Sequence, residues 1–351
     1  MENSLVKVGI SVGDINGIGM EVIIKALSDA RILQTCAPVV FGSPKLASFY
    51  RKQLNIQDFS FNFIKGWDSI NQKQPSLYVT WEEEINIEPG ADVPLGGAYA
   101  LRSLDAGIQA LIEGHIDVLV TAPVNKHNIK PETGIFRGHT EYLGEKFGKS
   151  NPVMMMVSET MRVVPVTGHI ALSEVSGRIS IDLITEKTII AIQSLQQDFS
   201  VRKPKVAMLG LNPHAGDQGL LGKEEQTIIK PAVDRLKEQG HLVFGPFPSD
   251  GFFGSGAFSK YDLIVAMYHD QALIPFKTLS FSNGVNFTAG LPYVRTSPDH
   301  GVAYDIAGQN KAGEASFRQS VYLAVDAFKN RKQHKEITSN PLKITQQKRE
   351  R

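Results

Sequence analysis

The sequence predicts an α/β protein in which parallel strands alternate with crossover helices. Most apolar runs are about four to eight residues long and rich in Val and Ile, which is typical of strands buried on both faces. Segments with helical spacing of apolar residues lie between these runs, as α/β units require. The length of 351 residues indicates about two domains, because single cores rarely grow past roughly 250–300 residues.

The expected elements follow the apolar pattern along the chain. The predicted strands are VKVGISV near residue 6, APVVFG near residue 37, and the runs at 117–123, 152–159, 162–169, 205–212 and 262–269. The predicted helices are 20–33, 97–113, 140–147, 173–197, 224–239 and 314–330. The segment 55–74 is the least regular and is expected to be a surface excursion. Since open α/β sheets bind ligands beyond the carboxyl ends of their strands, residues that follow the strands are the first site candidates.

Charge and cysteine content exclude several classes of partner. The 37 Lys and Arg and 36 Asp and Glu leave a formal charge of +1, so we expect no nucleic-acid and no membrane partner. The single cysteine, Cys36, excludes an internal disulfide and indicates a reducing, cytoplasmic location. No apolar run reaches the ~18–20 residues of a membrane span, and the first residues do not resemble a signal peptide.

The C-terminal segment 331–351 is strongly basic. From Lys329 onward, eight lysines and arginines face two glutamates, which gives a net charge of +6. We expect a solvated, poorly ordered tail there rather than a nucleic-acid arm.

Three histidines end predicted strands: His169, His214 and His269. Neutral imidazoles at the carboxyl ends of strands can together hold a divalent metal ion and leave coordination positions open. Their wide separation in sequence leaves a second interpretation, in which each is a hydrogen-bonded loop histidine. Asp217, Asp250 and Asp270 lie near two of them in the sequence and are candidates to fix the imidazole tautomers.

A glycine-rich turn follows the first predicted strand. Its residues Gly13, Asp14, Gly17 and Gly19 precede a predicted helix, and we predict that they contact a cofactor, because glycine lets backbone amides approach a ligand closely. The turn matches neither the dinucleotide fingerprint nor the P-loop, so an ordinary tight turn is an equal alternative.

A second group of polar residues lies around the helix at 140–147. Lys126 follows the strand at 117–123, and His139 and Thr140 open the helix, where amide and hydroxyl donors favour a phosphate or carboxylate ligand. The alternative is an ordinary helix start in which Thr140 is the N-cap and Glu141 lies in the first turn.

Lys277, Asn286 and Arg295 follow the third histidine. The two cations lie in a region with few acidic residues, which an anionic substrate or plain solvation would explain. No G-x-S-x-G motif is present and Cys36 lacks the sequence context of a nucleophile, so covalent acyl transfer is not favoured.

Five ordered motifs make the chain resemble the 4-hydroxythreonine-4-phosphate dehydrogenases of vitamin B6 biosynthesis up to about residue 330. They are the Gly-Asp-x-x-Gly-Ile-Gly of 13–19, the Gly-His-Thr-Glu of 138–141, the Asn-Pro-His-Ala-Gly of 212–216, the Met-Tyr-His-Asp-Gln of 267–271 and the Gly-Leu-Pro-x-x-Arg-Thr-Ser of 290–297. Met20 and Gly251 depart from the family pattern, which has Pro and Thr at these positions.

The resemblance implies a fold and an assembly. The fold is of the isocitrate/isopropylmalate-dehydrogenase type, with two α/β/α domains around a central cleft. Residues 1–131 and 290–330 would form the first domain, and residues 132–289 would form the second, which carries the metal ligands. Family members act as homodimers with the active site near the subunit interface.

The resemblance also assigns residues. His169, His214 and His269 would bind one divalent metal ion, with zinc favoured over cobalt, magnesium or manganese. The substrate, a small phosphorylated amino acid, would contact five residues, namely His139, Thr140, Lys277, Asn286 and Arg295.

The implied reaction is NAD- or NADP-linked oxidation of 4-phosphooxy-L-threonine to a β-keto acid, which loses carbon dioxide to give 3-amino-2-oxopropyl phosphate. Lys126 and Asp250 are the candidate proton acceptors. Two alternatives remain at this point. One is a sister dehydrogenase that acts on D-threonate or D-erythronate 4-phosphate or on an aromatic cis-dihydrodiol. The other is a non-catalytic protein that binds metal or phosphate on the same scaffold.

Overall fold

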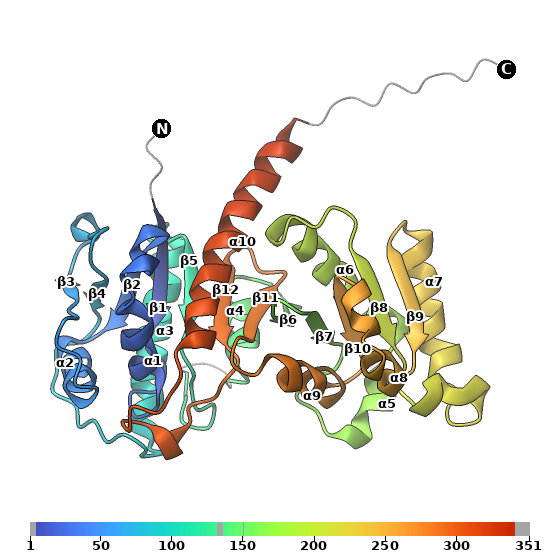
Figure 1. Cartoon of the computed structure of the whole chain (residues 1–351), viewed down its shortest axis with the longest axis horizontal. Coiled ribbons are helices and arrows are strands. Elements are labelled where there is room, and N and C mark those ends of the chain that lie inside the picture. Colours follow the sequence, from blue (N-terminus) through green and yellow to red (C-terminus); the bar gives the residue numbers. More distant parts are fainter. Residues whose placement is uncertain (1–4, 132–135, 150, 341–351) are drawn as a thin grey trace.

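A single twelve-stranded sheet runs through the molecule, with helices packed against both of its faces (Figure 1). The computed structural model describes residues 5–131, 136–149 and 151–340. The strand order is β3-β4-β2-β1-β5-β12-β11-β6-β7-β10-β8-β9. The α/β class predicted from the apolar pattern is therefore confirmed.

The bounds of the elements are as follows. The strands are β1 Val6–Ser11, β2 Cys36–Gly42, β3 Asn62–Ile64, β4 Ser76–Val79, β5 Val118–Thr121, β6 Val153–Val157, β7 Arg162–Pro165, β8 Lys205–Leu209, β9 Leu242–Phe247, β10 Leu263–Ala266, β11 Val285–Ala289 and β12 Val294–Pro298. The α-helices are α1 Gly19–Leu27, α2 Pro44–Gln53, α3 Pro94–Ile112, α4 His139–Lys146, α5 Val175–Arg178, α6 Ile181–Asp198, α7 Lys230–Glu238, α8 Ser249–Gly254, α9 His269–Ser280 and α10 Ala315–Ser339.

The sheet is mixed, which corrects the expectation of a purely parallel one. Strand β11 runs antiparallel to both β12 and β6, and β6 runs antiparallel to β7. The cause is the length of the connections, because a short turn can join only antiparallel neighbours. Ser158 and Met161 close the β6–β7 turn with a backbone hydrogen bond of 3.0 Å, and Gly290 begins the β11–β12 turn at a φ of 85°.

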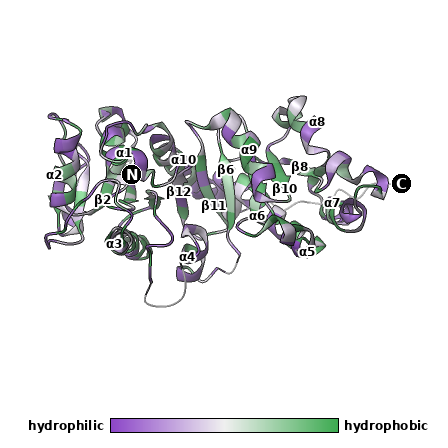
Figure 2. Cartoon of the chain, turned by 90° about the horizontal axis from the view of Figure 1, so that it is seen from below, coloured by the Kyte–Doolittle hydropathy of each residue, from purple (hydrophilic) through white to green (hydrophobic). Residues whose placement is uncertain are grey.

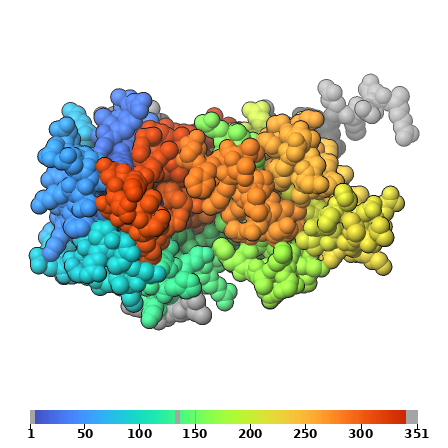
Figure 3. Space-filling view, turned by 60° about the horizontal axis from the view of Figure 1, so that its bottom comes forward, coloured from blue at the N-terminus to red at the C-terminus, as the bar shows by residue number. Residues whose placement is uncertain are grey.

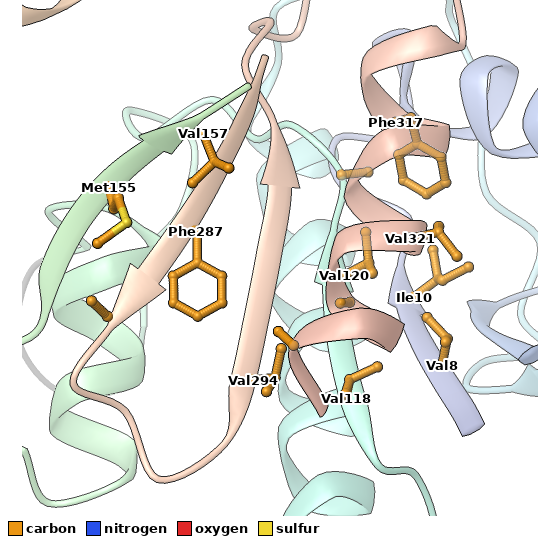
Figure 4. Close-up of a cluster of buried hydrophobic side chains, with 14 of the residues drawn as sticks. Val8, Ile10, Val118, Val120, Met155, Val157, Phe287, Val294, Phe317 and Val321 are labelled. Atoms are coloured by element: carbon orange, nitrogen blue, oxygen red, sulfur yellow. The ribbon is translucent and has the colours of Figure 1, made fainter. Parts of the chain in front are cut away.

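One face of the sheet carries a continuous apolar core. Val120 of β5, Val294 of β12 and Phe287 of β11 point to this face, where Phe317 and Val321 of α10 pack on them (Figure 4). Helices α1, α6 and α7 extend the same cluster along the sheet. Figure 2 shows the hydrophobic strands in the middle of the molecule and the hydrophilic residues on the outer helices.

The opposite face carries two separate apolar clusters instead of one. The first packs α3 and α4 on β2, β3 and β5, and the second packs α8 and α9 on β6, β7, β8 and β10. Neither cluster includes a described residue of β11 or β12, which are neighbours in the middle of the sheet. The fold therefore leaves room for a site between the two clusters.

The division into two domains remains a prediction, because the sheet is continuous across the proposed border. The border at residue 290 falls between β11 and β12, and residues 132–135 at the other border lie outside the described residues. The orange and red C-terminal segments lie between the blue N-terminal part and the yellow part of the second half (Figure 3).

Helix α10 continues past the expected start of the tail. It ends at Ser339 rather than at residue 330, and Arg331 donates hydrogen bonds of 2.6 and 3.0 Å to the buried carboxylate of Asp198. This ion pair fixes the helix against α6, so residues 331–339 are helical and not part of a poorly ordered tail. Residues 341–351 lie outside the described residues.

No helix within the described ranges is both long enough and apolar enough to cross a membrane.

Candidate active site

The gap between the two clusters is a cavity of about 220 Å³ lined by polar side chains. Strand alternation places Thr121, Arg295, Ser297 and Asn286 on this face of the sheet, while their neighbours face the continuous core. The residues of the cavity wall that the sequence had singled out are Lys126, His139, Thr140, His169, Asn286 and Arg295. Six predicted site residues, far apart in the sequence, thus meet at one place.

Arg295 is a buried cation without a carboxylate partner. Its side chain is 1% exposed, and its guanidinium donates to Thr121 Oγ1 at 2.5 and 3.2 Å and to Thr288 Oγ1 at 3.1 Å. No acidic oxygen lies within 4.0 Å of it in the described part of the chain. Burial lowers the pKa of Arg295 to about 9, and Glu141 raises it slightly. Because a charge in the interior is costly unless it is paired, an anionic ligand is the partner that this site lacks.

Among the described residues, three further polar atoms of the cavity wall are buried without a hydrogen-bond partner. They are His139 Nε2, Asn286 Oδ1 and His300 Nε2. Buried polar groups are nearly always paired in native proteins, so each of these atoms marks a direction from which a ligand is contacted. The Nδ1 of His300 lies 3.2 Å from the carbonyl oxygen of Gly301 and donates to it when the neutral ring carries its proton on Nδ1.

His139 and Thr140 open helix α4 toward the cavity. Gly138 precedes the helix with a φ of 155°, and no side chain caps the helix, so the alternative in which Thr140 is the N-cap is wrong. Burial, together with the positive charges of Arg295 and Lys126, holds the pKa of His139 well below its usual range. The neutral imidazole and the free N–H groups of the first turn are suited to an anion.

Lys277 lies at the rim and already has a partner. Its Nζ is 3.2 Å from Asp299 Oδ1, and Asp299 lines the cavity. The sequence predicts too few acidic residues in this region to pair both cations. In the described part of the chain, Lys277 has an acidic partner and Arg295 has none.

His169 and His269 lie side by side, with ring centroids 5.8 Å apart. His169 also belongs to the cavity wall, and the Nδ1 of His269 is 2.7 Å from Asp270 Oδ1. A carboxylate on one ring nitrogen leaves the other nitrogen free to bind a metal, which confirms Asp270 as a tautomer-fixing neighbour. Two imidazoles at this separation fit one divalent ion whose bonds to nitrogen are about 2.0–2.1 Å long.

His214 and Asp250 do not join His169 and His269 in one group of side chains that could hold a metal ion. Within the described residues no group of three His, Cys, Asp or Glu side chains is close enough to hold a metal ion. His214 is exposed in the short segment η4 (Pro213–Gly219), which packs against α8, the helix that carries Asp250. These two residues thus belong to a second patch on the surface of the chain.

The glycine-rich turn is buried within the protein. A Cβ added to Gly13 or Gly19 would lie 2.3 or 2.2 Å from a backbone oxygen of the chain, and one on Gly17 would meet a valine side chain at 2.3 Å. Asp14 accepts a hydrogen bond of 2.8 Å from Tyr304. Close packing explains these glycines, and their contact with a cofactor remains a prediction that this geometry does not support.

Several residues of the cavity were missed from the sequence. Thr121, Glu141, Asp299 and His300 line it, and Thr288 holds Arg295. Part of the signal was present, because polar residues lie on either side of Phe287 at 286–288, whereas 295–297 are polar at every position. Period-two polarity within a strand marks one polar face.

A cavity with a buried arginine that has no carboxylate partner among the described residues, beside a pair of imidazoles, makes the chain an α/β protein with a candidate site for a small polar ligand. The family model described as "Pyridoxal phosphate biosynthetic protein PdxA" matches residues 34–324. A 4-hydroxythreonine-4-phosphate dehydrogenase of Bacteroides thetaiotaomicron is 46% identical over 344 residues, which cover 98% of this chain and 94% of that protein. The chain belongs to the PdxA family.

Solved structures agree with this assignment. A 4-hydroxythreonine-4-phosphate dehydrogenase structure from Klebsiella pneumoniae matches with a TM-score of 0.79 and 32% identity, over 93% of this chain and 100% of that one. One from Burkholderia phymatum matches with a TM-score of 0.76 and 32% identity, over 93% and 99%. These matches confirm the fold that the resemblance implied.

The unpaired cation predicts a large stabilisation by anions. Inorganic phosphate should raise the midpoint of thermal unfolding of the parent protein more than chloride does at equal ionic strength. In Arg295→Met the midpoint without phosphate should be unchanged or higher, because a desolvated charge is removed, and the phosphate effect should be lost. A phosphate effect of equal size in parent and variant would contradict the assignment.

The depressed pKa of His139 predicts acid destabilisation. The unfolded chain binds a proton on this residue below about pH 6.5 and the folded chain does not, so the free energy of unfolding falls as the pH drops below that value. When the pH is lowered from 6.5 to 5.5, the free energy of unfolding of His139→Gln should fall by about 1 kcal/mol less than that of the parent, as measured by urea titration. The control variant His127→Gln, at an exposed histidine, should lose as much free energy of unfolding as the parent does. The same pH dependence in the parent and in both variants would refute the interpretation.

Proposed function

We propose that the chain is a 4-hydroxythreonine-4-phosphate dehydrogenase that uses NAD or NADP and one divalent metal ion. The secondary alcohol of 4-phosphooxy-L-threonine loses a hydride to the nicotinamide and its hydroxyl proton to a base. The resulting β-keto acid loses carbon dioxide to give 3-amino-2-oxopropyl phosphate. The observation that carries the proposal is the buried, unpaired Arg295 in a chain whose relatives are named for a phosphorylated substrate.

The cavity supports an assignment of the phosphate. Arg295 engages oxyanions through two parallel N–H groups, and the first turn of α4 adds backbone donors and the His139 ring. Asn286 Oδ1 and His300 Nε2 are acceptors, which suit the ammonium and hydroxyl groups of an amino-acid substrate. The cavity of about 220 Å³ suits a molecule of that size and is too small for a dinucleotide.

Removing the hydroxyl proton is the difficult step. Forming an alkoxide at pH 7 costs on the order of 12 kcal/mol if the hydroxyl pKa is near that of water. A positioned base is typically worth about 10²- to 10⁴-fold, or roughly 3–5 kcal/mol, which is insufficient alone. Of the two candidate proton acceptors, Lys126 lines the cavity of its own chain, so we assign the proton to Lys126. Asp250 would reach the site only from a second copy of the chain.

His169 and His269 fit two ligands of the metal ion, with zinc favoured. When bound, such an ion supplies the positive charge that lowers the pKa of a nearby hydroxyl. The third ligand, His214, would come from a second copy of the chain. A homodimer that places the η4–α8 patch of one copy over the cavity of the other would supply both His214 and Asp250, which one chain alone does not bring to the site.

The alternatives are phosphate esters of other hydroxy acids, an aromatic cis-dihydrodiol and a non-catalytic role. A terephthalate 1,2-cis-dihydrodiol dehydrogenase structure from Burkholderia xenovorans shares the fold at 23% identity and a TM-score of 0.60. Arg295 favours an anionic substrate, and because a terephthalate dihydrodiol also carries carboxylates, it is the names of the relatives that favour the phosphorylated substrate.

The proposal is tested with purified protein, zinc and NAD or NADP by following nicotinamide reduction. 4-Phosphooxy-L-threonine should be oxidised, and kcat/KM for unphosphorylated 4-hydroxythreonine should be about 10²-fold lower, because a charge-assisted pair with Arg295 is lost. His214→Ala should abolish turnover and zinc retention together. Arg295→Lys should lose selectivity for the phosphate, whereas Arg318→Lys on α10 should keep it.

Two outcomes would overturn the proposal. Faster oxidation of D-threonate 4-phosphate, D-erythronate 4-phosphate or a cis-dihydrodiol would assign a sister activity. Binding of zinc and phosphate without oxidation of any alcohol of the panel would assign a non-catalytic protein.

A further inference from the structure

The loop that carries His214 has an unusual backbone conformation. Residues 214–218 all have positive φ values, of 55°, 51°, 81°, 41° and 56° in order, and only Gly216 among them is a glycine. This run is one turn of left-handed helix, which L-residues adopt only when the surroundings impose it. Something outside the turn must therefore hold it.

A buried carboxylate, that of Glu225, contacts the two residues at the entrance of this turn. Its carboxylate is 3% exposed at the start of the segment η5 (Glu225–Ile229), which leads into α7. The Oε1 atom accepts hydrogen bonds of 2.7 Å from the backbone N–H groups of Leu211 and Asn212, and Oε2 accepts one of 3.1 Å from Asn212 Nδ2. Glu225 thus binds the two residues through which the chain enters the left-handed turn.

The fit between this carboxylate and the loop leaves no spare room. A Cβ on Gly216 would lie 2.5 Å from Glu225 Oε2, and one on Gly210 would lie 3.1 Å from Oε1. No Lys, Arg or His lies within 4.0 Å of the carboxylate in the described part of the chain. The charge of Glu225 is therefore balanced by N–H donors of the loop, which is an arrangement that depends on the conformation of the loop.

The turn is also held by local contacts. Backbone hydrogen bonds of 3.1 Å join Ala215 N–H to Asn212 O, Leu220 N–H to Asp217 O and Leu221 N–H to Gly216 O, and η4 packs against β9 and α8. His214 is exposed and its ring has no hydrogen-bond partner in the described structure. The backbone of the turn therefore sets where the Cα–Cβ bond of His214 points, and Glu225 supports that backbone at Leu211 and Asn212.

We propose that Glu225 is a positioning residue that holds the left-handed turn and so presents His214 as a metal ligand. The inference rests on the proposed function in one respect, namely that His214 binds the metal ion. Its structural part, that Glu225 fixes the turn, stands on the contacts alone. Partners that orient a metal ligand typically contribute 10- to 100-fold to metal affinity.

The experiment combines hydrogen exchange of the metal-free protein with zinc affinity measured by chelator competition. In Glu225→Ala the amides of Leu211 and Asn212 should exchange at least about tenfold faster, and zinc should bind 10- to 100-fold more weakly. Glu225→Gln, which keeps one acceptor oxygen for the two backbone N–H groups, should fall between the parent and Glu225→Ala. If Glu225→Ala does not fold, the exchange rates and zinc affinity of Glu225→Gln, compared with those of the parent, test the proposal.

Glu224→Gln is the matched control. Glu224 is the preceding residue and also accepts a hydrogen bond from Asn212 Nδ2, of 2.8 Å, but it does not contact the two backbone N–H groups. This variant should keep the exchange rates and the zinc affinity of the parent within about twofold. An equal loss in Glu224→Gln and Glu225→Gln would overturn the specific role of Glu225.

His214→Ala separates the two hypotheses. If it loses zinc while the Glu225 variants retain parental affinity and parental exchange, the positioning role is wrong and the metal assignment stands. If His214→Ala binds zinc as tightly as the parent, the metal assignment of the proposed function is wrong. In that case faster exchange in the Glu225 variants would leave Glu225 as a purely structural support of the turn, and the inference would fall.

Discussion

The buried guanidinium of Arg295 is the constraint on which the site depends. A cation that is 1% exposed and, within the residues that the structure describes, held only by the hydroxyls of Thr121 and Thr288 calls for a ligand that completes its pairing. The sheet supplies the place, because the apolar core on one face is continuous while the other face leaves its middle uncovered. The first turn of α4 then closes the cavity with the neutral ring of His139.

The predicted metal ligands and the candidate base Asp250 lie in two patches. His169 and His269 adjoin the cavity, whereas His214 and Asp250 lie together on the surface formed by η4 and α8. Such a division is expected of a site shared between two copies of a chain, because neither patch holds a metal ion by itself. In this account, rigid elements carry the first patch and a strained loop, supported by Glu225, carries the second.

Sequence reasoning recovered much of the fold and six residues of the cavity wall. The seven apolar runs are all strands, since continuous Val- and Ile-rich segments have few other solutions in an α/β protein. It missed β3, β4, β9, β11 and β12, and the runs of the last two are interrupted by Asn286, Thr288, Arg295 and Ser297. The polar residues that make the site are the ones that weakened the strand signal.

Other features had no signal in the sequence. The separation of His214 from His169 and His269 depends on how distant segments pack, and each of the three ends an apolar run in the same way. The glycines of the turn at 13–19 suggested a ligand, and only the packing revealed that the chain itself occupies the space beside them. The left-handed turn was equally hidden, because four of its five residues are not glycine.

The most direct test of the central claim is a crystal structure of the protein with 4-phosphooxy-L-threonine bound. We expect two oxygens of the phosphate within about 3 Å of the guanidinium nitrogens of Arg295, with a third oxygen reached by the first turn of α4. A phosphate bound elsewhere, with Arg295 still paired only to its two threonine hydroxyls, would contradict the account.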